Sequence, residues 1–231
     1  LKQSEELNYI KQKQYKFKVK ISDRSQDPEN PPLATSANVT INIKDVNKPS
    51  RFEVLSDLYE SDENVTKGTE LDGDYIGVYD DDEADVNKLN ITITDDDGTN
   101  ADKLFKVVQV DETDTEKHLT TFVIKTNTAD LDYEKLYKES ENGAIFNVTL
   151  SIIDGSGTPT TAKTVLRVND INEDPKFKKE TYTFKIDENV KEATVLGKAE
   201  AKDPDIYTPK YGTLYYSLEG DDANKFDINP S

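Results

Sequence analysis

The feature that most constrains the fold of this chain is an internal repeat. The same short signatures return at a nearly constant offset of 123 to 125 residues. The repeated pairs are Asp45-Val46-Asn47 with Asp170-Ile171-Asn172, Phe52 with Phe177, Asp62-Glu63-Asn64-Val65 with Asp187-Glu188-Asn189-Val190, Asp80-Asp81-Asp82 with Asp203-Pro204-Asp205, and Leu7-Asn8-Tyr9 with Leu131-Asp132-Tyr133. One module is therefore repeated along the chain.

Within a module, apolar residues alternate with polar ones. The clearest runs are residues 15–21, 146–152 and 182–186, which are rich in β-branched and aromatic side chains and predict half-buried strands. Turn clusters separate the runs. The acidic runs Asp95-Asp96-Asp97 and Asp111-Glu112-Thr113-Asp114 have no counterpart at the repeat offset, and we expect them to be hairpin turns. Short strands with regular turns and no long helical period predict an antiparallel β-sandwich.

The repeat offset also sets the expected domain boundaries. Residues 1–48 would be the C-terminal half of one module, residues 49–174 a complete module, and residues 175–231 the N-terminal part of a third. Half a sandwich cannot bury its open face. We therefore expect the sequence to be a segment of a longer array.

Acidic side chains dominate the charge, with 47 Asp and Glu against 29 Lys and Arg and a formal net charge of −18. This excess disfavours binding to nucleic acid and direct contact with an anionic membrane surface. Acidity alone would equally suit a halophilic or simply soluble protein, so the placement of the acids has to decide.

The cellular compartment has to be inferred from features other than cysteine usage, since a chain without cysteine says nothing about its redox environment. The chain has no cysteine and no run of about 18 apolar residues, and its first residues are not a signal peptide. A secreted parent would carry a signal peptide and a membrane anchor elsewhere. Asn-x-Ser/Thr glycosylation acceptors occur at Asn38, Asn64, Asn90 and Asn147. Three of them, Asn38, Asn90 and Asn147, lie on the polar phase of alternating segments, where a glycan would point to solvent.

The order of the signatures resembles that of cadherin repeats. That family has a Glu-Asn near the first strand, an Asp-x-Asp after the second, a Leu-Asp-x-Glu in mid-repeat, a later Asp-x-Gly, and an Asp-x-Asn-Asp-Asn linker before Pro-x-Phe. The resemblance covers essentially the whole chain. It implies an all-β fold of tandem seven-strand, Greek-key, immunoglobulin-like sandwiches, with calcium ions held where two repeats meet. Hard cations such as Ca²⁺ take about six to eight oxygen ligands.

For the junction between the second and third modules, the resemblance implies a nearly complete ligand set. The implied calcium ligands are Glu63, Asp132 and Glu134, then Asp170, Asn172, Glu173 and Asp174 in the linker, then Asp203 and Asp205. Glu173 stands where the family usually has Asp, and Asp174 where it usually has Asn. The linker is also one residue shorter before Pro175.

The junction between the first and second modules departs further from the family pattern. Asn8, Ile10 and Lys48 stand where the family has acids. An Ile side chain offers no ligand, and an ammonium group repels a divalent cation. The remaining implied ligands are Asn47, Asp80, Asp82 and Asp154. We expect this junction to hold one calcium ion or none.

The resemblance implies a calcium-dependent protein of cell adhesion or cell-surface recognition. The segment would be extracellular, belong to a parent anchored in the plasma membrane, and bind another cadherin-like ectodomain of the same or a different kind. A bacterial surface stalk of cadherin-like repeats is the alternative. An enzyme is not expected, because the chain lacks Cys, has one His without a nucleophile motif, and repeats its acids at module boundaries. We expect that histidine, His118, to be exposed and to have no special role.

Overall fold

The computed structural model describes residues 6–24, 26–82, 88–110, 118–129, 131–140, 143–155 and 159–230. It divides into two compact units, Leu1–Lys48 and Pro49–Ser231. Each unit is described by itself below.

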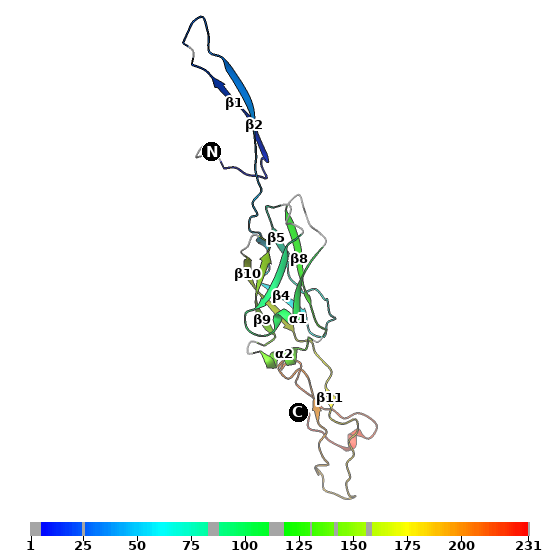
Figure 1. The fold of residues 1–231 in the computed structure, drawn as a ribbon. Helices are drawn as coiled ribbons and strands as arrows, with labels where there is room; N and C mark the ends of the chain where they lie inside the picture. The colour runs from blue at the N-terminus through cyan, green and yellow to red at the C-terminus, as the bar shows by residue number, and fades with distance from the viewer. Residues whose placement is uncertain are drawn as a thin grey trace. The chain divides into compact units, whose positions relative to one another are not determined.

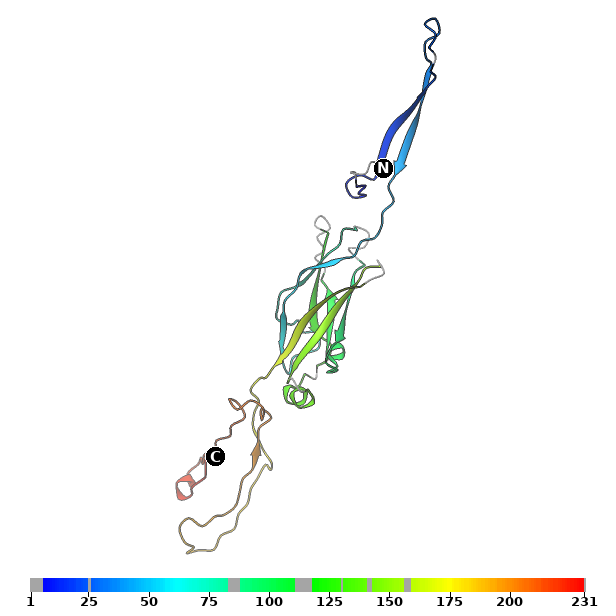
Figure 2. The same cartoon turned by 90° about the vertical axis from the view of Figure 1, so that its left-hand side faces the viewer.

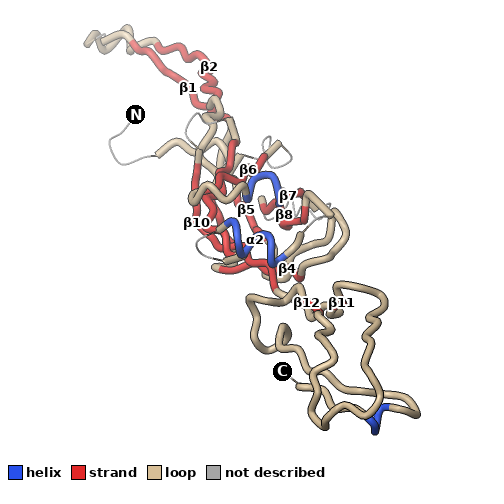
Figure 3. Tube along the Cα trace, turned by 90° about the horizontal axis from the view of Figure 1, so that it is seen from below, coloured by secondary structure: helices blue, strands red, loops and turns tan. Residues whose placement is uncertain are grey.

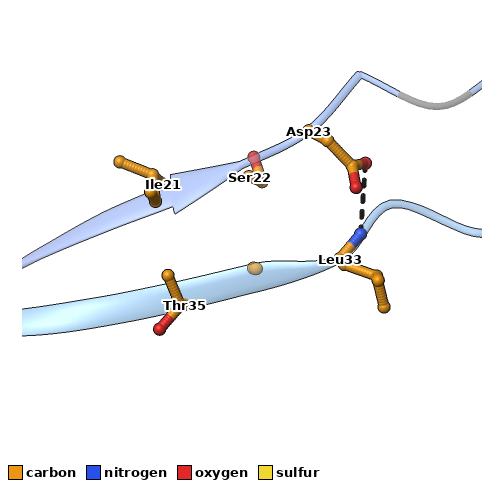
Figure 4. Close-up of a pocket in the computed structure, with 6 residues that line it drawn as sticks. Ile21, Ser22, Asp23, Leu33 and Thr35 are labelled. Atoms are coloured by element: carbon orange, nitrogen blue, oxygen red, sulfur yellow. Dashed lines mark hydrogen bonds between the residues drawn. The ribbon is translucent and has the colours of Figure 1, made fainter.

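The first unit is built around one antiparallel hairpin. Strand β1 (Gln14–Ser22) pairs with β2 (Ala34–Asn42) in continuous register, from Gln14 opposite Asn42 to Ser22 opposite Ala34. The strand predicted for residues 15–21 is therefore confirmed, but its predicted half-burial is wrong, since Phe17, Val19 and Ile21 are exposed. At the far end, the Asp23 carboxylate accepts the backbone N–H of Leu33 at 3.1 Å, beside a shallow hollow lined by Ile21 and Thr35 (Figure 4). This bond joins the two strand ends where the connecting loop leaves the hairpin.

The second unit contains two four-stranded sheets packed face to face (Figures 1 and 2). One sheet has the order β3 (Arg51–Val54), β5 (Ile76–Tyr79), β8 (Leu119–Thr126) and β7 (Phe105–Gln109). The other has the order β4 (Leu58–Asp62), β10 (Thr160–Asn169), β9 (Ile145–Ile153) and β6 (Asn90–Asp95). Every neighbouring pair is antiparallel except β4 and β10, which run parallel. The predicted all-β sandwich is confirmed.

The sandwich has eight named strands rather than seven because its first strand is divided. Strands β3 and β4 belong to opposite sheets, and residues 55–57 carry the chain from one sheet to the other. β3 pairs with β5, whereas β4 pairs with β10. The division lets one segment seal an edge of each sheet, which limits exposed strand edges.

The core lies between the two sheets. In β9, the side chains of Phe146, Val148, Leu150 and Ile152 are buried, whereas Asn147 between them is exposed. This alternation is the one predicted for residues 146–152, and it is confirmed. The ring of Phe146 meets that of Phe105 from the other sheet edge-on, with centroids 5.5 Å apart. Burial of side chains of this size stabilises the fold by about 1.5–3 kcal/mol each.

Two short helices interrupt the β-structure at crossings between the sheets. Helix α1 (Ala101–Leu104) lies between β6 and β7, and α2 (Tyr133–Glu139) lies between β8 and β9. No helix among the described residues is long and apolar enough to cross a membrane. The hairpin turn expected at residues 95–97 is wrong, because this segment leads from β6 into α1 and then into the opposite sheet. The second acidic run, Asp111-Glu112-Thr113-Asp114, lies outside the described residues.

The residues after Asp174 contain little regular structure. Strands β11 (Lys176–Phe177) and β12 (Ala201–Lys202) form a short antiparallel pair, and η1 (Ala223–Lys225) is a single 3-10 turn (Figure 3). The strand predicted for residues 182–186 is not formed. A strand requires a neighbouring backbone for its hydrogen bonds, and in the described chain none pairs with this segment.

Candidate metal centre

Four carboxylates converge at one end of the sandwich. One oxygen each from Glu63, Glu134, Asp170 and Asp205 lies within 4.8 Å of the others. Glu63 directly follows β4 and Asp170 directly follows β10, so the parallel pairing of these strands places both acids at the same end. Glu134 stands in the first turn of α2, and Asp205 comes from the loop after β12. The site therefore joins segments that are far apart in the sequence.

Glu63 is held by the backbone around it. Its side chain is 3% exposed, and its two oxygens accept the N–H groups of Tyr133 at 2.7 Å and Ile171 at 3.0 Å. Burial raises the pKa of Glu63, with the two N–H bonds opposing and the nearby Glu173 and Asp170 carboxylates adding to the rise. The bonds fix the position of the carboxylate and favour its charged form, whereas burial makes that charge costly.

The pKa of Glu134 is raised strongly by its position in the cluster. Burial raises the pKa of its carboxyl group from 4.5 to about 7. The negative charges of Glu63, Asp170 and Asp205 act in the same direction. Near neutral pH, this site therefore resists holding four negative charges without a cation.

Asp205 is fixed by its own loop and by the linker. It is fully buried, its N–H donates to Asp203 Oδ1 at 3.0 Å, and its Oδ2 accepts the backbone N–H of Glu173 at 2.9 Å. Asp82 and Asp80 make the same N–H to Oδ1 bond at 2.8 Å. The repeated Asp-x-Asp signature thus produces the same local turn in both copies.

The cluster has more oxygen acceptors than donors. Buried oxygens without a hydrogen-bond partner in the described structure are Glu134 Oε1, Asp170 Oδ1, Asp170 Oδ2 and Asp205 Oδ1. None of the salt bridges between described residues involves the four carboxylates. Buried charged oxygens without donors are costly unless a cation neutralises them. An all-oxygen set of this kind fits a hard cation such as Ca²⁺ and lacks the ligands of soft metals.

The other ligands predicted for this junction lie around the cluster in different roles. Asp132 is the N-cap of α2, where its Oδ1 accepts the N–H of Lys135 at 2.7 Å. Glu173 is half-buried, and its Oε1 accepts the Asn64 side-chain amide at 3.2 Å. Asn172 and Asp174 are exposed. Of the residues that flank Asp132, Leu131 is buried and Tyr133 is half-buried, and Tyr133 is the first residue of α2.

The ligands predicted for the junction between the first and second modules do not form a cluster of this kind. Asp80 and Asp82 are buried, and Asp154 Oδ2 accepts the N–H and hydroxyl of Ser50 at 2.6 and 2.9 Å. Asn47 belongs to the other compact unit. Among the described residues, the only set of three or more acids, His or Cys close enough to share an ion is the cluster at Glu63. His118, expected to be exposed, is half-buried at 6.1 Å from the Tyr79 ring.

The four glycosylation acceptors all have exposed side chains. Asn38 lies in β2, Asn90 in β6 and Asn147 in β9, each beside buried or half-buried apolar neighbours. Asn64 instead has a left-handed backbone, with φ 58°, next to the cluster. Asn147 donates its side-chain amide to Asp97 Oδ2 at 2.6 Å.

Aromatic residues beside the cluster were missed by the sequence analysis. The ring of Tyr137 on α2 stacks on that of Tyr207, with centroids 4.6 Å apart and planes at 22°. Tyr207 follows the second Asp-x-Asp signature, and the matching position after the first, Ala84, is not aromatic. A search for repeated signatures therefore could not find it.

Comparison with known proteins identifies relatives by sequence. Cadherin-9 of Mus musculus is 27% identical over 210 residues, covering 86% of this chain and 25% of that protein. Cadherin-related family member 1 of Gallus gallus is 29% identical over 240 residues, covering 97% of this chain and 25% of that protein. Cadherin-87A of Drosophila melanogaster is 36% identical over 102 residues, covering 44% of this chain and 5% of that protein. The chain spans about a quarter or less of the length of these relatives. No protein-family model matches it.

Solved structures with the same fold include mouse Cadherin-23 EC22-24, with a TM-score of 0.59, 21% identity, and coverage of 97% of this chain and 63% of that chain. The human Desmocollin-1 ectodomain has a TM-score of 0.51 and 20% identity, covering 97% of this chain and 40% of that chain. At these identities the similarity establishes the fold alone.

The two-sheet sandwich, with a carboxylate cluster at one end, defines an all-β module with a candidate site for a hard cation. Within this class, the resemblance to cadherin repeats is confirmed, because the curated homologues are cadherins and cadherin-related proteins. The prediction that the chain is not an enzyme is confirmed, because its homologues are adhesion proteins.

Proposed function

We propose that the chain is a segment of a calcium-dependent cell-adhesion ectodomain, and that Ca²⁺ stiffens the junction after residue 174. The observation that carries this proposal is the set of four carboxylates within 4.8 Å, drawn from both sides of that junction. Glu63, Glu134, Asp170 and Asp205 would bind the ion directly. Bound Ca²⁺ would replace the mutual repulsion of these groups by shared coordination.

Further ligands are proposed from the same neighbourhood. Asp132, Asn172, Glu173, Asp174 and Asp203 would complete the coordination of this or adjacent ions, since Ca²⁺ takes about six to eight oxygens. Asp80, Asp82 and Asp154 are proposed as ligands of a separate ion. The expected affinity is that of extracellular modules, with a Kd on the order of 10⁻⁴–10⁻³ M.

The biological setting follows from the homologues. They support an extracellular location, in a parent protein that we propose is anchored in the plasma membrane outside this segment. Its partner would be another cadherin-like ectodomain. This chain would carry glycans at Asn38, Asn64, Asn90 and Asn147. The relatives reported above are animal proteins, which favours this function over a bacterial surface stalk.

The test is calcium binding measured on the whole chain. Isothermal titration of calcium-free protein should give binding in the range stated above, and small-angle scattering should change as calcium is added. The variant Asp170→Asn removes one charge from the cluster and should weaken calcium binding, whereas Glu139→Gln, at an exposed acid outside the cluster, should leave it unchanged. Identical scattering with and without calcium, together with no binding heat from the unmodified chain, would refute the proposal.

A further inference from the structure

Helix α2 and the loop carrying Asp205 meet through a stacked pair of tyrosines. Tyr137 lies one turn after Glu134, and Tyr207 lies two residues after Asp205. Their ring centroids are 4.6 Å apart and their planes are at 22°. The stack therefore joins the two elements that supply Glu134 and Asp205 to the carboxylate cluster.

The ring of Tyr137 is also supported from its own side of the junction. Tyr133, one turn earlier on α2, places its ring 5.7 Å from that of Tyr137. A Cβ added to Gly143 would lie 3.1 Å from Tyr137 Cδ2, so the backbone passes close to the ring there. These neighbours limit the directions in which the Tyr137 ring can turn.

The stack involves neither a carboxylate nor a metal ion, so it does not depend on the charge of the cluster.

The loop transmits this contact to Asp205 because it is internally bonded. The N–H of Thr208 donates to the carbonyl of Asp205 at 3.0 Å, and the N–H of Gly212 donates to the carbonyl of Thr208 at 3.0 Å. Asp205 N–H donates to Asp203 Oδ1. Holding Tyr207 against the helix therefore fixes the position of the Asp205 carboxylate.

Without a cation, the four carboxylates repel one another, and this repulsion favours movement of the Asp205 loop away from α2. We propose that the Tyr137–Tyr207 stack is a metal-independent clamp. It holds Asp205 beside the other three carboxylates before calcium binds. Tyr137 and Tyr207 are positioning residues in this scheme, since they act on the ion only through Asp205.

The clamp can be tested without calcium. The chain has no cysteine, so Thr92→Cys in β6 and Lys185→Cys after the linker, both at exposed positions, provide unique sites for spin labels. In calcium-free protein, the distance distribution between the labels should be narrow, and Tyr207→Ala should broaden it. Tyr207→Phe keeps the ring and should restore the narrow distribution.

Tyr215→Ala is the matched control, because Tyr215 lies in the same segment and is 82% exposed. It should leave the distribution unchanged. The clamp is refuted if the unmodified chain is already as broad as Tyr207→Ala, or if Tyr215→Ala broadens it equally.

A second measurement rests on the proposed calcium function. Because a preorganised site does not have to be assembled by the ion, Tyr207→Ala should raise the Kd for calcium by roughly two- to tenfold, with Tyr207→Phe near the unmodified value. An unmodified chain that binds no calcium would defeat the proposed function alone, since the label distances in calcium-free protein would still decide on the clamp. Calcium binding with equal Kd in Tyr207→Ala would defeat the clamp alone.

Discussion

Gly212 lies directly against the backbone of Asp205. A Cβ added to Gly212 would come within 2.2 Å of the Asp205 carbonyl oxygen and 2.8 Å of its carbonyl carbon. These are backbone atoms, which cannot rotate away as a side chain can. The loop that carries a proposed calcium ligand is therefore built on a close approach that only glycine permits.

We predict that Gly212→Ala displaces Asp205 and weakens calcium binding. Forcing an extra methyl group into a packed site costs about 1–3 kcal/mol, and here the displaced atoms belong to a proposed ligand. Calorimetric titration should show a higher Kd. Gly197→Ala is the control, because its new methyl group would meet the exposed ring of Phe184, which can move. Equal calcium affinity in both variants would contradict the prediction.

Calcium should raise the melting temperature, and Glu134→Ala should remove most of that rise. An ion bound only by the folded state adds RT ln(1 + [L]/Kd), or about 1.4 kcal/mol at a tenfold excess over Kd. In chelator, loss of Glu134 should not lower the melting temperature, because the unbound cluster is already too negative. The control is Glu139→Ala, an exposed acid on the same helix. If Glu134→Ala destabilised the chain equally in calcium and in chelator, its role would be structural.

The calcium-free chain should lose stability as the pH rises from 4.5 to 7. The pKa of Glu134 is raised from 4.5 to about 7, chiefly by burial. Within this window the folded chain keeps a proton that the unfolded chain has released, so the free energy of unfolding falls with increasing pH. Below the window, both states hold the proton and this contribution is fully present.

Thermal melts of calcium-free protein at about pH 5 and about pH 8 measure this effect. Glu134→Gln has no carboxyl group to titrate at this position, so its stability should fall less with increasing pH than that of the unmodified chain. Glu139→Gln should lose as much stability as the unmodified chain. The prediction is wrong if Glu134→Gln and the unmodified chain lose the same stability over this range.

Asp132 should stabilise the chain even without calcium, because it caps helix α2. Its carboxylate caps α2 by accepting the N–H of Lys135. Removal of an N-cap acceptor costs about 0.5–2 kcal/mol, so Asp132→Ala should lower the melting temperature even in chelator. Asp132→Asn keeps a good capping group and should retain most of that stability. An unchanged melt for Asp132→Ala in chelator would show that the cap contributes little.

The sequence predicted the sandwich where side-chain alternation coincides with burial on one face. Phe146 to Ile152 alternate and form β9 in the middle of a sheet, with neighbours on both sides. The same kind of alternation at Tyr182, Phe184 and Ile186 does not form a strand. Alternation describes what a strand would bury, but pairing depends on a partner backbone that local sequence does not specify.

Helix α2 shows a different limit. Leu131 and Tyr133 alternate with acids over too short a stretch to separate a strand end from the start of a helix. The capping residue Asp132, with Leu136 buried one turn later, is the helical signal that could have found α2.

The repeat offset identified acids of the cluster that are widely separated in the chain, including Glu63 and Asp205. It could not distinguish those that face one another from those used elsewhere. Asp132 is committed to a helix cap and Asp203 to a turn, while Asn172 faces solvent. The four that converge do so because β4 and β10 end together and α2 and the Asp205 loop pack beside them. These are tertiary relationships, which motif order alone does not contain.

The parallel pairing of β4 and β10 also has a mechanical consequence. The chain enters the sandwich through its first strands and leaves it through β10, whose last residues are in register with those of β4 from Val165 opposite Leu58 to Asn169 opposite Asp62. Tension applied between the entry and the exit pulls these two strands along each other in opposite directions. The hydrogen bonds between them are then loaded in shear, so they share the force and have to break together. A module with this topology resists forced unfolding from its ends more strongly than one whose terminal strands separate one hydrogen bond at a time.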